Sequence, residues 1–175
     1  MSTFQLDGLQ PKIDSTCYVA PGALIIGDVQ MGSDSSLWYN SILRGDVFHI
    51  RIGRRTNIQD LCMGHVTSGT HPLIIGDDVT VGHRAVLHGC MIEDRVLIGI
   101  GALVMDGAHI GKESLIAAGS IVTPNTKIPA GVMAMGAPAR VKRELTPEEK
   151  GAFVASAEHY VQLAKQHRKS LQLLR

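Results

Sequence analysis

A six-residue repeat of aliphatic residues constrains the fold of this 175-residue chain more than any other feature. Within each run, a large aliphatic residue recurs at every sixth position, and a small or β-branched residue follows it four positions later. The large positions are Val19, Ile25, Met31, Leu37, Leu43, Ile52, Ile58, Ile75, Val81, Leu87, Ile98, Val104, Ile110, Ile116, Val122 and Ile128. The small positions include Ala23, Val29, Ser35, Ser41, Val47, Ala85, Ala102, Ala108, Ser114, Ser120 and Thr126. We expect both positions to point inward, because a fixed short period is typical of a solenoid.

Residues that tolerate left-handed backbone angles stand between these two positions, three residues after the large one. They are Gly22, Asp28, Asp34, Asn40, Asp46, Asp78, Gly101, Gly107, Gly119, Asn125 and Gly131. A corner in every hexad follows from them. Short strands joined at such corners predict an all-β fold, a parallel β-helix with three hexads per coil. A β-sandwich would alternate every two residues, with turns every 8–12 residues, and does not fit.

A helix is predicted after the repeat, which ends at Gly136–Arg140. Thr146, Pro147 and Glu149 form the pattern of a capping box with proline at the first helical position. Apolar residues then keep broadly helical spacing, which predicts a helix from about Pro147 to Leu173. We therefore divide the chain into a β-helix domain (1–140) and a C-terminal α-helix (141–175) that packs on its side. A helix on a membrane surface is the weaker alternative.

The composition excludes several classes of function. A net charge of +1 leaves no basic stripe for nucleic acid. No apolar run approaches the roughly 20 residues of a membrane span, and the N-terminus lacks a signal pattern. Three scattered cysteines favour a reducing compartment over a disulfide framework. The sequence thus predicts a cytoplasmic protein that binds neither nucleic acid nor membrane.

Three histidines, His65, His83 and His88, lie close together within this aliphatic repeat. Imidazole is the commonest protein ligand of zinc-like ions, and three histidines with an open water position are typical of a catalytic site. His65 and His88 occupy the same position of the hexad, but a corner should separate His83 from His88. One chain would struggle to bring all three nitrogens to one ion, whereas the interface of a symmetric trimer would solve this. His71 lies in an irregular loop and is left out.

Four motifs in order resemble the gamma-class carbonic anhydrase family. They are Arg44-Gly45-Asp46, then Asn57–Asp60, then Gly64-His65, then Gly82–Cys90. The resemblance covers the repeat and the trailing helix. It implies a left-handed β-helix and a homotrimer in which His65, His83 and His88 bind zinc, or ferrous or cobalt ion, between subunits.

The resemblance also implies roles for other residues. Gln59 would orient the metal-bound water, with Asn57 around the pocket and Tyr160 lining it from the helix. Arg44, Asp46 and Asp60 would form charged contacts across the interface. Simpler interpretations stay open: Asp46 as a corner residue, Arg44 and Asp60 as solvated charges, and Tyr160 as a packing residue. Cys17 and Cys62 stand at the small inward position, which predicts packing.

The leading functional hypothesis is metal-dependent hydration of the small molecule carbon dioxide to bicarbonate. Val47 stands where active members of the family can carry a glutamate. The segment between the first two histidines is short and has only Asp77 and Asp78 as acids, so we expect slow turnover. The alternatives are an acyltransferase that uses a CoA thioester, favoured by Gly136–Arg140, a metal-dependent acyl-CoA thioesterase, and a non-catalytic trimeric scaffold. Fold alone cannot decide between them.

Overall fold

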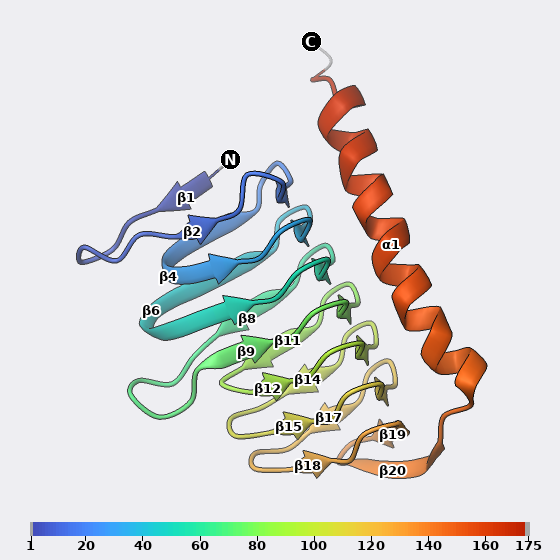
Figure 1. The fold of residues 1–175 in the computed structure, drawn as a ribbon. Helices are drawn as coiled ribbons and strands as arrows, with labels where there is room; N and C mark the ends of the chain where they lie inside the picture. The colour runs from blue at the N-terminus through green and yellow to red at the C-terminus, as the bar shows by residue number, and fades with distance from the viewer. Residues whose placement is uncertain (1, 174–175) are drawn as a thin grey trace.

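The computed structural model describes residues 2–173, which form a parallel β-helix with one long helix along its side (Figure 1). The predicted fold class is confirmed: the chain is a parallel β-solenoid of about seven turns, consistent with a left-handed β-helix of hexapeptide repeats. Leu97 pairs with Leu115 and Ile98 with Ile116, so three hexads make one coil, as predicted.

Two sheets form the three faces of the solenoid. The 12-stranded sheet contains β1 (Ser2–Phe4), β2 (Lys12–Ile13), β4 (Leu24–Met31), β6 (Ile42–Ile52), β8 (Met63–His65), β9 (Leu73–Ile75), β11 (Val86–His88), β12 (Met91–Ile92), β14 (Leu103–Val104), β15 (His109–Ile110), β17 (Ile121–Val122) and β18 (Lys127–Ile128). The 8-stranded sheet contains β3 (Tyr18–Val19), β5 (Ser36–Leu37), β7 (Asn57–Ile58), β10 (Thr80–Val81), β13 (Leu97–Ile98), β16 (Leu115–Ile116), β19 (Val132–Gly136) and β20 (Ala139–Glu144).

The 12-stranded sheet makes two faces because β4 and β6 both run round a corner. The first face consists of β1, β8, β11, β14 and β17 with the starts of β4 and β6. The second face consists of β2, β9, β12, β15 and β18 with the ends of β4 and β6. We call the 8-stranded sheet the helix face.

The core is the column of large aliphatic positions that the repeat predicts. All of them are buried except Val19, which is half-buried. Serine is tolerated at the small inward position because its hydroxyl finds a backbone acceptor in the next coil. Ser35 donates to the carbonyl of Gly53 at 2.7 Å and Ser41 to that of Gln59 at 2.6 Å.

The corner prediction holds for most hexads and is wrong for two. Asp34, Asn40, Asp78 and Asn125 have positive φ angles, as do the predicted glycines. Asp28 and Asp46 do not, because the continuous strands β4 and β6 pass through those corners.

The prediction that Val47 points inward is also wrong, since its side chain is 47% exposed. Gly45 pairs with Gly27 but Ile50 pairs with Val29, so β6 carries extra residues at this corner. The surplus residues bulge outward, and Val47 goes with them.

Helix α1 (Pro147–Ser170) begins as predicted. Thr146 accepts from the backbone of Glu149, and the Glu149 side chain accepts from the backbone of Thr146, which completes the capping box. The helix ends at Ser170 and not at Leu173, because Leu171 takes an extended conformation. Strand β20 crosses the expected boundary at residues 140 and 141. Met1, Leu174 and Arg175, at the ends of the two expected domains, lie outside the described residues.

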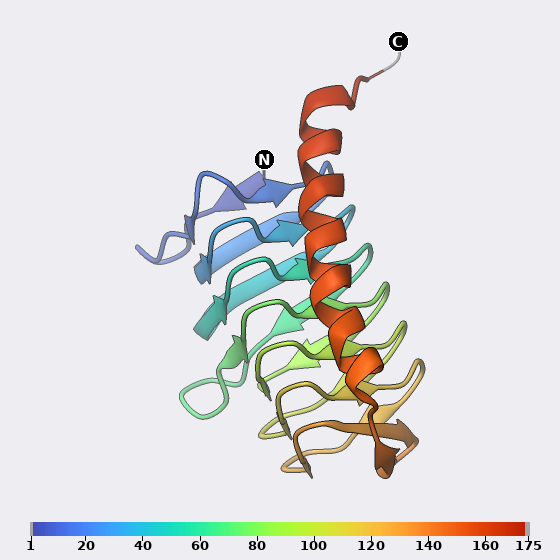
Figure 2. The ribbon, with the colours of Figure 1, turned by 45° about the vertical axis from the view of Figure 1, so that its right-hand side comes forward.

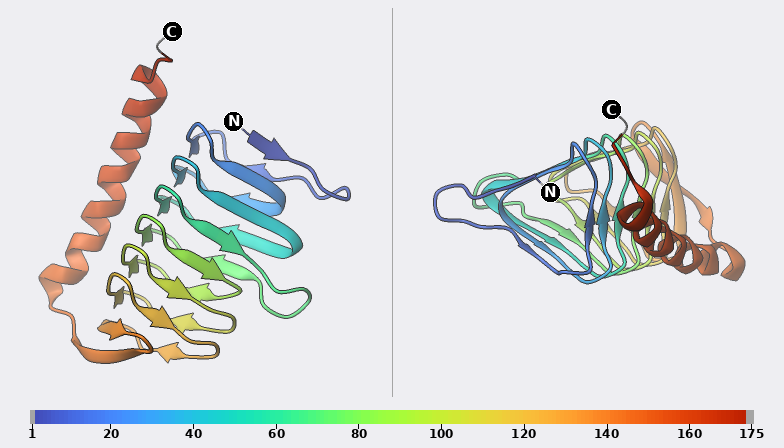
Figure 3. Two further views of the ribbon diagram at one scale, coloured as in Figure 1. Left: turned by 180° about the vertical axis from the view of Figure 1, so that it is seen from behind. Right: turned by 90° about the horizontal axis from the view of Figure 1, so that it is seen from above.

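Helix α1 packs along the helix face, against β3, β5, β7 and β10 (Figures 2 and 3). Its buried residues are Phe153, Ala157, Val161 and Ala164. These residues lie on the side of the helix that contacts the solenoid. Within residues 2–173, no helix has the length and apolar character that crossing a membrane requires.

Candidate metal centre

His65 and His88 face each other at the edge of the first face. Strands β8 and β11 pair these two residues directly, and His65 Nδ1 lies 3.0 Å from His88 Nε2. Gly64, just before His65, takes a large inward position of the repeat. A β-carbon there would come within 2.6 Å of Leu43 Cδ2 and 3.0 Å of Leu73 Cδ2, so the glycine lets these leucines fill the core beneath the histidines.

The second nitrogen of each ring meets a carboxylate. His65 Nε2 lies 3.0 Å from Asp46 Oδ1, and His88 Nδ1 lies 2.6 Å from Asp106 Oδ1. Where these nitrogens donate their protons to the carboxylates, the two nitrogens that face each other both carry lone pairs. Two lone pairs on nitrogens 3.0 Å apart repel each other, and a cation between them would turn this repulsion into attraction. In a tetrahedral zinc site the ligand nitrogens lie about 3.3 Å apart, so this pair fits such an ion.

His83 lies at the opposite edge of the first face, in the corner between β10 and β11. Arg84, the next residue, has a φ of 61° and makes the turn. The Nδ1 atom of His83 is 2.8 Å from Asp60 Oδ2, so this ring too has a carboxylate on one nitrogen. Over the part of the chain that the structure describes, no three His, Cys, Asp or Glu side chains gather within one chain to hold a metal.

Gln59 and Asn57 lie on the side of His83. The backbone N–H of His83 donates to Gln59 Oε1 at 3.2 Å, and Gln59 Nε2 donates to Asn57 Oδ1 at 3.2 Å. Asn57 in turn donates to the hydroxyl of Thr80 at 3.0 Å. Gln59 and Asn57 are both buried, so this chain of hydrogen bonds fixes the orientation of the Gln59 amide.

Tyr160 reaches the same region from helix α1. Its ring packs edge-on against Trp38, with the centroids 5.5 Å apart, in a cluster with Tyr18 and Ala164. Burial raises the pKa of the Tyr160 hydroxyl, and the nearby negative charge of Asp60 adds to this. These contacts favour packing, and a role in the pocket stays a prediction.

The predicted interface charges have partners within the chain. Arg44 forms an ion pair with Asp46, and Asp46 also contacts His65. Burial works to raise the pKa of Asp46, but the hydrogen bonds from His65 and Arg44 outweigh it and lower the pKa below its ordinary value. Asp46 therefore contacts the ring of His65, and it lacks the positive φ angle of a turn residue. Contacts of Arg44, Asp46 and Asp60 across a subunit boundary stay a prediction.

Asp106 is the site residue that sequence reasoning missed. Val104 pairs with Leu87, so Asp106 stacks on Gly89, the residue after His88. That register is readable from the repeat, and it would have placed a carboxylate beside the third histidine. Burial works to raise the pKa of Asp106, but hydrogen bonds from His88 and Thr67 outweigh it and lower the pKa.

The cysteines lie outside the candidate site. Cys17, Cys62 and Cys90 are free and buried. Burial raises the pKa of the Cys17 thiol to about 11 and of the Cys62 and Cys90 thiols to about 12, which disfavours the reactive thiolate. The packing role predicted for Cys17 and Cys62 agrees with this burial.

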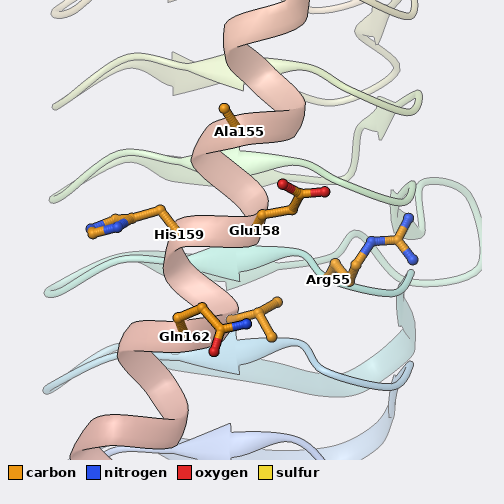
Figure 4. A pocket seen from close by; sticks show the side chains of 6 residues that line it. Arg55, Ala155, Glu158, His159 and Gln162 are labelled. Atoms are coloured by element: carbon orange, nitrogen blue, oxygen red, sulfur yellow. The ribbon is translucent and has the colours of Figure 1, made fainter.

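A groove of about 500 Å³ runs beside helix α1 (Figure 4). It is lined by Arg55, Ala155, Glu158, His159, Val161 and Gln162. Arg55 is held by a two-pronged ion pair with Asp78, with both distances at 2.6 Å. The lining contains none of the three candidate ligand histidines, so the groove is separate from the metal centre.

Comparison with known proteins places these features in a family. Residues 89–124 match the model described as "Bacterial transferase hexapeptide (six repeats)". The chain is 48% identical over 162 residues to "Gamma carbonic anhydrase 1, mitochondrial" of Arabidopsis thaliana, which covers 90% of this chain and 59% of the plant protein. It is also 48% identical over 152 residues to "Probable carbonic anhydrase" of Methanocaldococcus jannaschii, which covers 87% of this chain and 95% of that protein. The chain belongs to the gamma carbonic anhydrase family.

A solved structure with the same fold carries a different functional name. A solved structure from Bacillus cereus, called a putative acetyltransferase, matches this gamma carbonic anhydrase family member with a TM-score of 0.93 and 44% identity. The match covers 98% of this chain and 99% of that one. The fold thus accommodates the acyltransferase alternative, but the relatives named carbonic anhydrase support the main hypothesis better.

Proposed function

We propose that this protein is a metal-dependent carbonic anhydrase that reversibly hydrates carbon dioxide to bicarbonate. The observation that carries the proposal is that His65, His83 and His88 each have a carboxylate on one ring nitrogen, which leaves the other free for a metal. A divalent ion held there, Zn²⁺ or alternatively Fe²⁺ or Co²⁺, supplies a hydroxide nucleophile at neutral pH.

The site is completed by a second copy of the chain, in a homotrimer. His65 and His88 lie at one edge of the first face and His83 at the other. An edge of one copy set against the opposite edge of the next brings the three rings together. A head-to-tail contact of this kind needs a closed ring, and a prism with three faces suits a ring of three.

The surface between the two edges supports this assembly. A ladder of outward-facing apolar side chains runs down the first face, each paired in register with the next. It consists of Leu24, Ile42, Met63, Val86, Leu103 and Ile121. The matching positions of the second face mix charged and apolar residues: Lys12, Gln30, Arg51, Ile74, Met91, His109 and Lys127. The apolar ladder is the surface we assign to the trimer axis.

Gln59 orients the attacking water. Its Oε1 atom accepts from the His83 backbone and keeps a second lone pair for a water hydrogen. Asn57 holds the amide in this orientation through Gln59 Nε2. Tyr160 lines the pocket from helix α1, and the Arg44–Asp46 pair and Asp60 add charged contacts across the interface while positioning their histidines.

Proton removal limits the rate. Val47 supplies no carboxylate at its exposed corner. Asp77 and Asp78, the acids between His65 and His83, are each engaged by an arginine, Arg54 and Arg55 respectively. Slow turnover follows, because neither carboxylate is free to accept protons. The buried free thiols support a reducing compartment such as the cytoplasm.

Metal analysis of anaerobically purified protein, paired with stopped-flow carbon dioxide hydration, tests the proposal. We expect about one divalent ion per chain and hydration that needs it. Replacing His65, His83 or His88 by Ala should remove most of the metal. Full metal content in all three variants would refute the site. Metal with acyl-CoA hydrolysis but no hydration would indicate the thioesterase, acyl transfer without metal the acyltransferase, and metal with neither activity the scaffold.

A further inference from the structure

We propose that Asp106 is a positioning residue that sets the ring of His88 for metal binding, and that Thr67 locks Asp106 in place. The inference rests on the metal site proposed above. Asp106 Oδ1 lies 2.6 Å from His88 Nδ1, and Asp106 Oδ2 accepts from the Thr67 hydroxyl at 3.0 Å. Because the two oxygens have separate partners, the carboxylate cannot rotate without losing one of them.

Gly89 provides the space that Asp106 occupies. Its φ is +54°, and a β-carbon there would come within 2.2 Å of Asp106 Oδ1 and 2.7 Å of the His71 β-carbon. Any side chain at this position would push the carboxylate away from His88. The glycine after the histidine is therefore part of the arrangement that orients the ring.

The irregular loop 66–72 holds Thr67 rigidly. The backbone N–H of Thr67 donates to the carbonyl of His71 at 3.0 Å, and that of His71 donates to the carbonyl of Thr67 at 3.2 Å. The loop thus interrupts the repeat and returns to it with Thr67 aimed at Asp106. Its role in this chain is to brace a carboxylate two coils further along.

Asp106 and Asp46 are not equivalent supports. Asp46 shares its carboxylate between His65 and the cation of Arg44, whereas the second partner of Asp106 is the neutral hydroxyl of Thr67. The negative charge of Asp106 therefore acts more fully on His88. By accepting from Nδ1–H it selects the ring form in which Nε2 carries the lone pair, and it makes that nitrogen a stronger ligand.

The test uses full-length Asp106→Asn and Asp106→Ala proteins with two readouts. Zinc affinity, measured by competition with a chelator, should fall 10–100-fold in Asp106→Asn, while the melting temperature of the metal-free protein stays close to wild type. In ¹⁵N NMR of the metal-free protein, His88 should carry its hydrogen on Nδ1 in wild type and shift toward Nε2 in Asp106→Ala.

Matched variants separate the positioning of the His88 ring from the general effect of removing a negative charge. Asp94→Asn makes the same change of charge, but Asn keeps the oxygen that accepts from the Asp77 backbone at 2.8 Å, so zinc affinity should be unchanged. Thr67→Val should weaken zinc binding, and Thr67→Ser should restore it. Equal losses in Asp94→Asn and Asp106→Asn, or wild-type affinity with an unchanged His88 ring in the Asp106 variants, would overturn the proposal.

The experiment also distinguishes the absence of a metal site from the failure of the proposal for Asp106. Wild-type protein that binds no zinc would refute the proposed function, and the NMR measurement would still decide the role of Asp106. A His88 ring that loses its Nδ1 hydrogen in Asp106→Ala would uphold the positioning, and an unchanged ring would exclude it.

Discussion

His83 and Asp60 come from successive coils, and their side chains meet with Nδ1 of the histidine 2.8 Å from Oδ2 of the aspartate. The contact leaves Nε2 of His83 free on the edge of the first face opposite His65 and His88. In the proposed trimer, this nitrogen would bind the metal that His65 and His88 of a neighbouring copy hold.

Mixing two inactive variants should therefore restore metal. In a trimer that contains both His65→Ala and His83→Ala chains, one contact joins a chain with intact His65 and His88 to one with intact His83. Up to one site in three should then regain metal and activity after joint refolding, measured by metal analysis and hydration assay, with mixed trimers verified by mass spectrometry.

The control mixture is His65→Ala with His88→Ala. These two ligands come from the same chain in the proposed site, so every chain would lack one of them and nothing should be restored. Inactivity of both mixtures would rule out a shared site.

Charge on the apolar ladder should break the trimer. Val86→Glu places a carboxylate in the middle of the first face, and burying it against another copy would be costly. We expect a monomer in light scattering together with loss of bound metal. Met91→Glu, at a position that is 46% exposed on the second face, is the matched control and should remain a trimer. Val86→Glu trimers with full metal would place the interface elsewhere.

Gln59→Ala should slow turnover and leave the metal in place. An orienting group that does not touch the ion commonly contributes 10–100-fold to activity. The measurement is kcat for carbon dioxide hydration alongside metal content. Complete loss of metal in this variant would make Gln59 structural, because its amide bridges His83 and Asn57.

Acid should weaken the start of helix α1. Hydrogen bonds from Arg143 and from the Thr146 backbone lower the pKa of Glu149 from 4.5 to about 2. A depressed pKa stabilises the fold above pH 4.5, and the contribution is lost as the pH falls from there toward 2. The melting temperature of wild type should therefore approach that of Glu149→Gln over this window. Glu158→Gln, later in the same helix, makes the same change of charge and is the matched control.

Two isoleucines that are close in the sequence, one in the core and one on the surface, should contribute very differently to the free energy of unfolding. Ile98 is fully buried and Ile100 is 56% exposed, although only one residue separates them. Ile98→Ala should lower the free energy of unfolding by about 2–5 kcal/mol. Ile100→Ala should change it by less than about 0.5 kcal/mol. Urea unfolding measures both, and similar losses would contradict the assigned repeat register.

Local chemistry explains which parts of the fold were predictable. Burial at Leu37 or Ile98 follows from the hexad alone, and the capping box at Thr146 is visible in four consecutive residues. Val47 and Asp46 also stand at positions of the hexad, but the predictions made from those positions, burial of Val47 and a turn at Asp46, were wrong. Their corner is spanned by β6, whose bulge depends on pairing with β4 and leaves no mark in the hexad itself.

The candidate site was predictable where its residues share one register. His65 and His88 occupy equal positions and do pair. Asp106 was missed because its partner lies one coil earlier and its second contact comes from a loop without a repeat. A search for carboxylates stacked on the corners that follow each histidine would have found it.

The packing of helix α1 has a consequence for synthesis. The helix follows all the coils in the sequence, yet it covers Tyr18 and Trp38, which lie on two early successive coils. A growing chain therefore builds its solenoid with an aromatic patch uncovered, and the patch closes only when residues near Tyr160 have left the ribosome. The helix emerges after all the coils and covers the earliest of them, so a chain stalled before the helix would present this patch to chaperones and to other stalled chains.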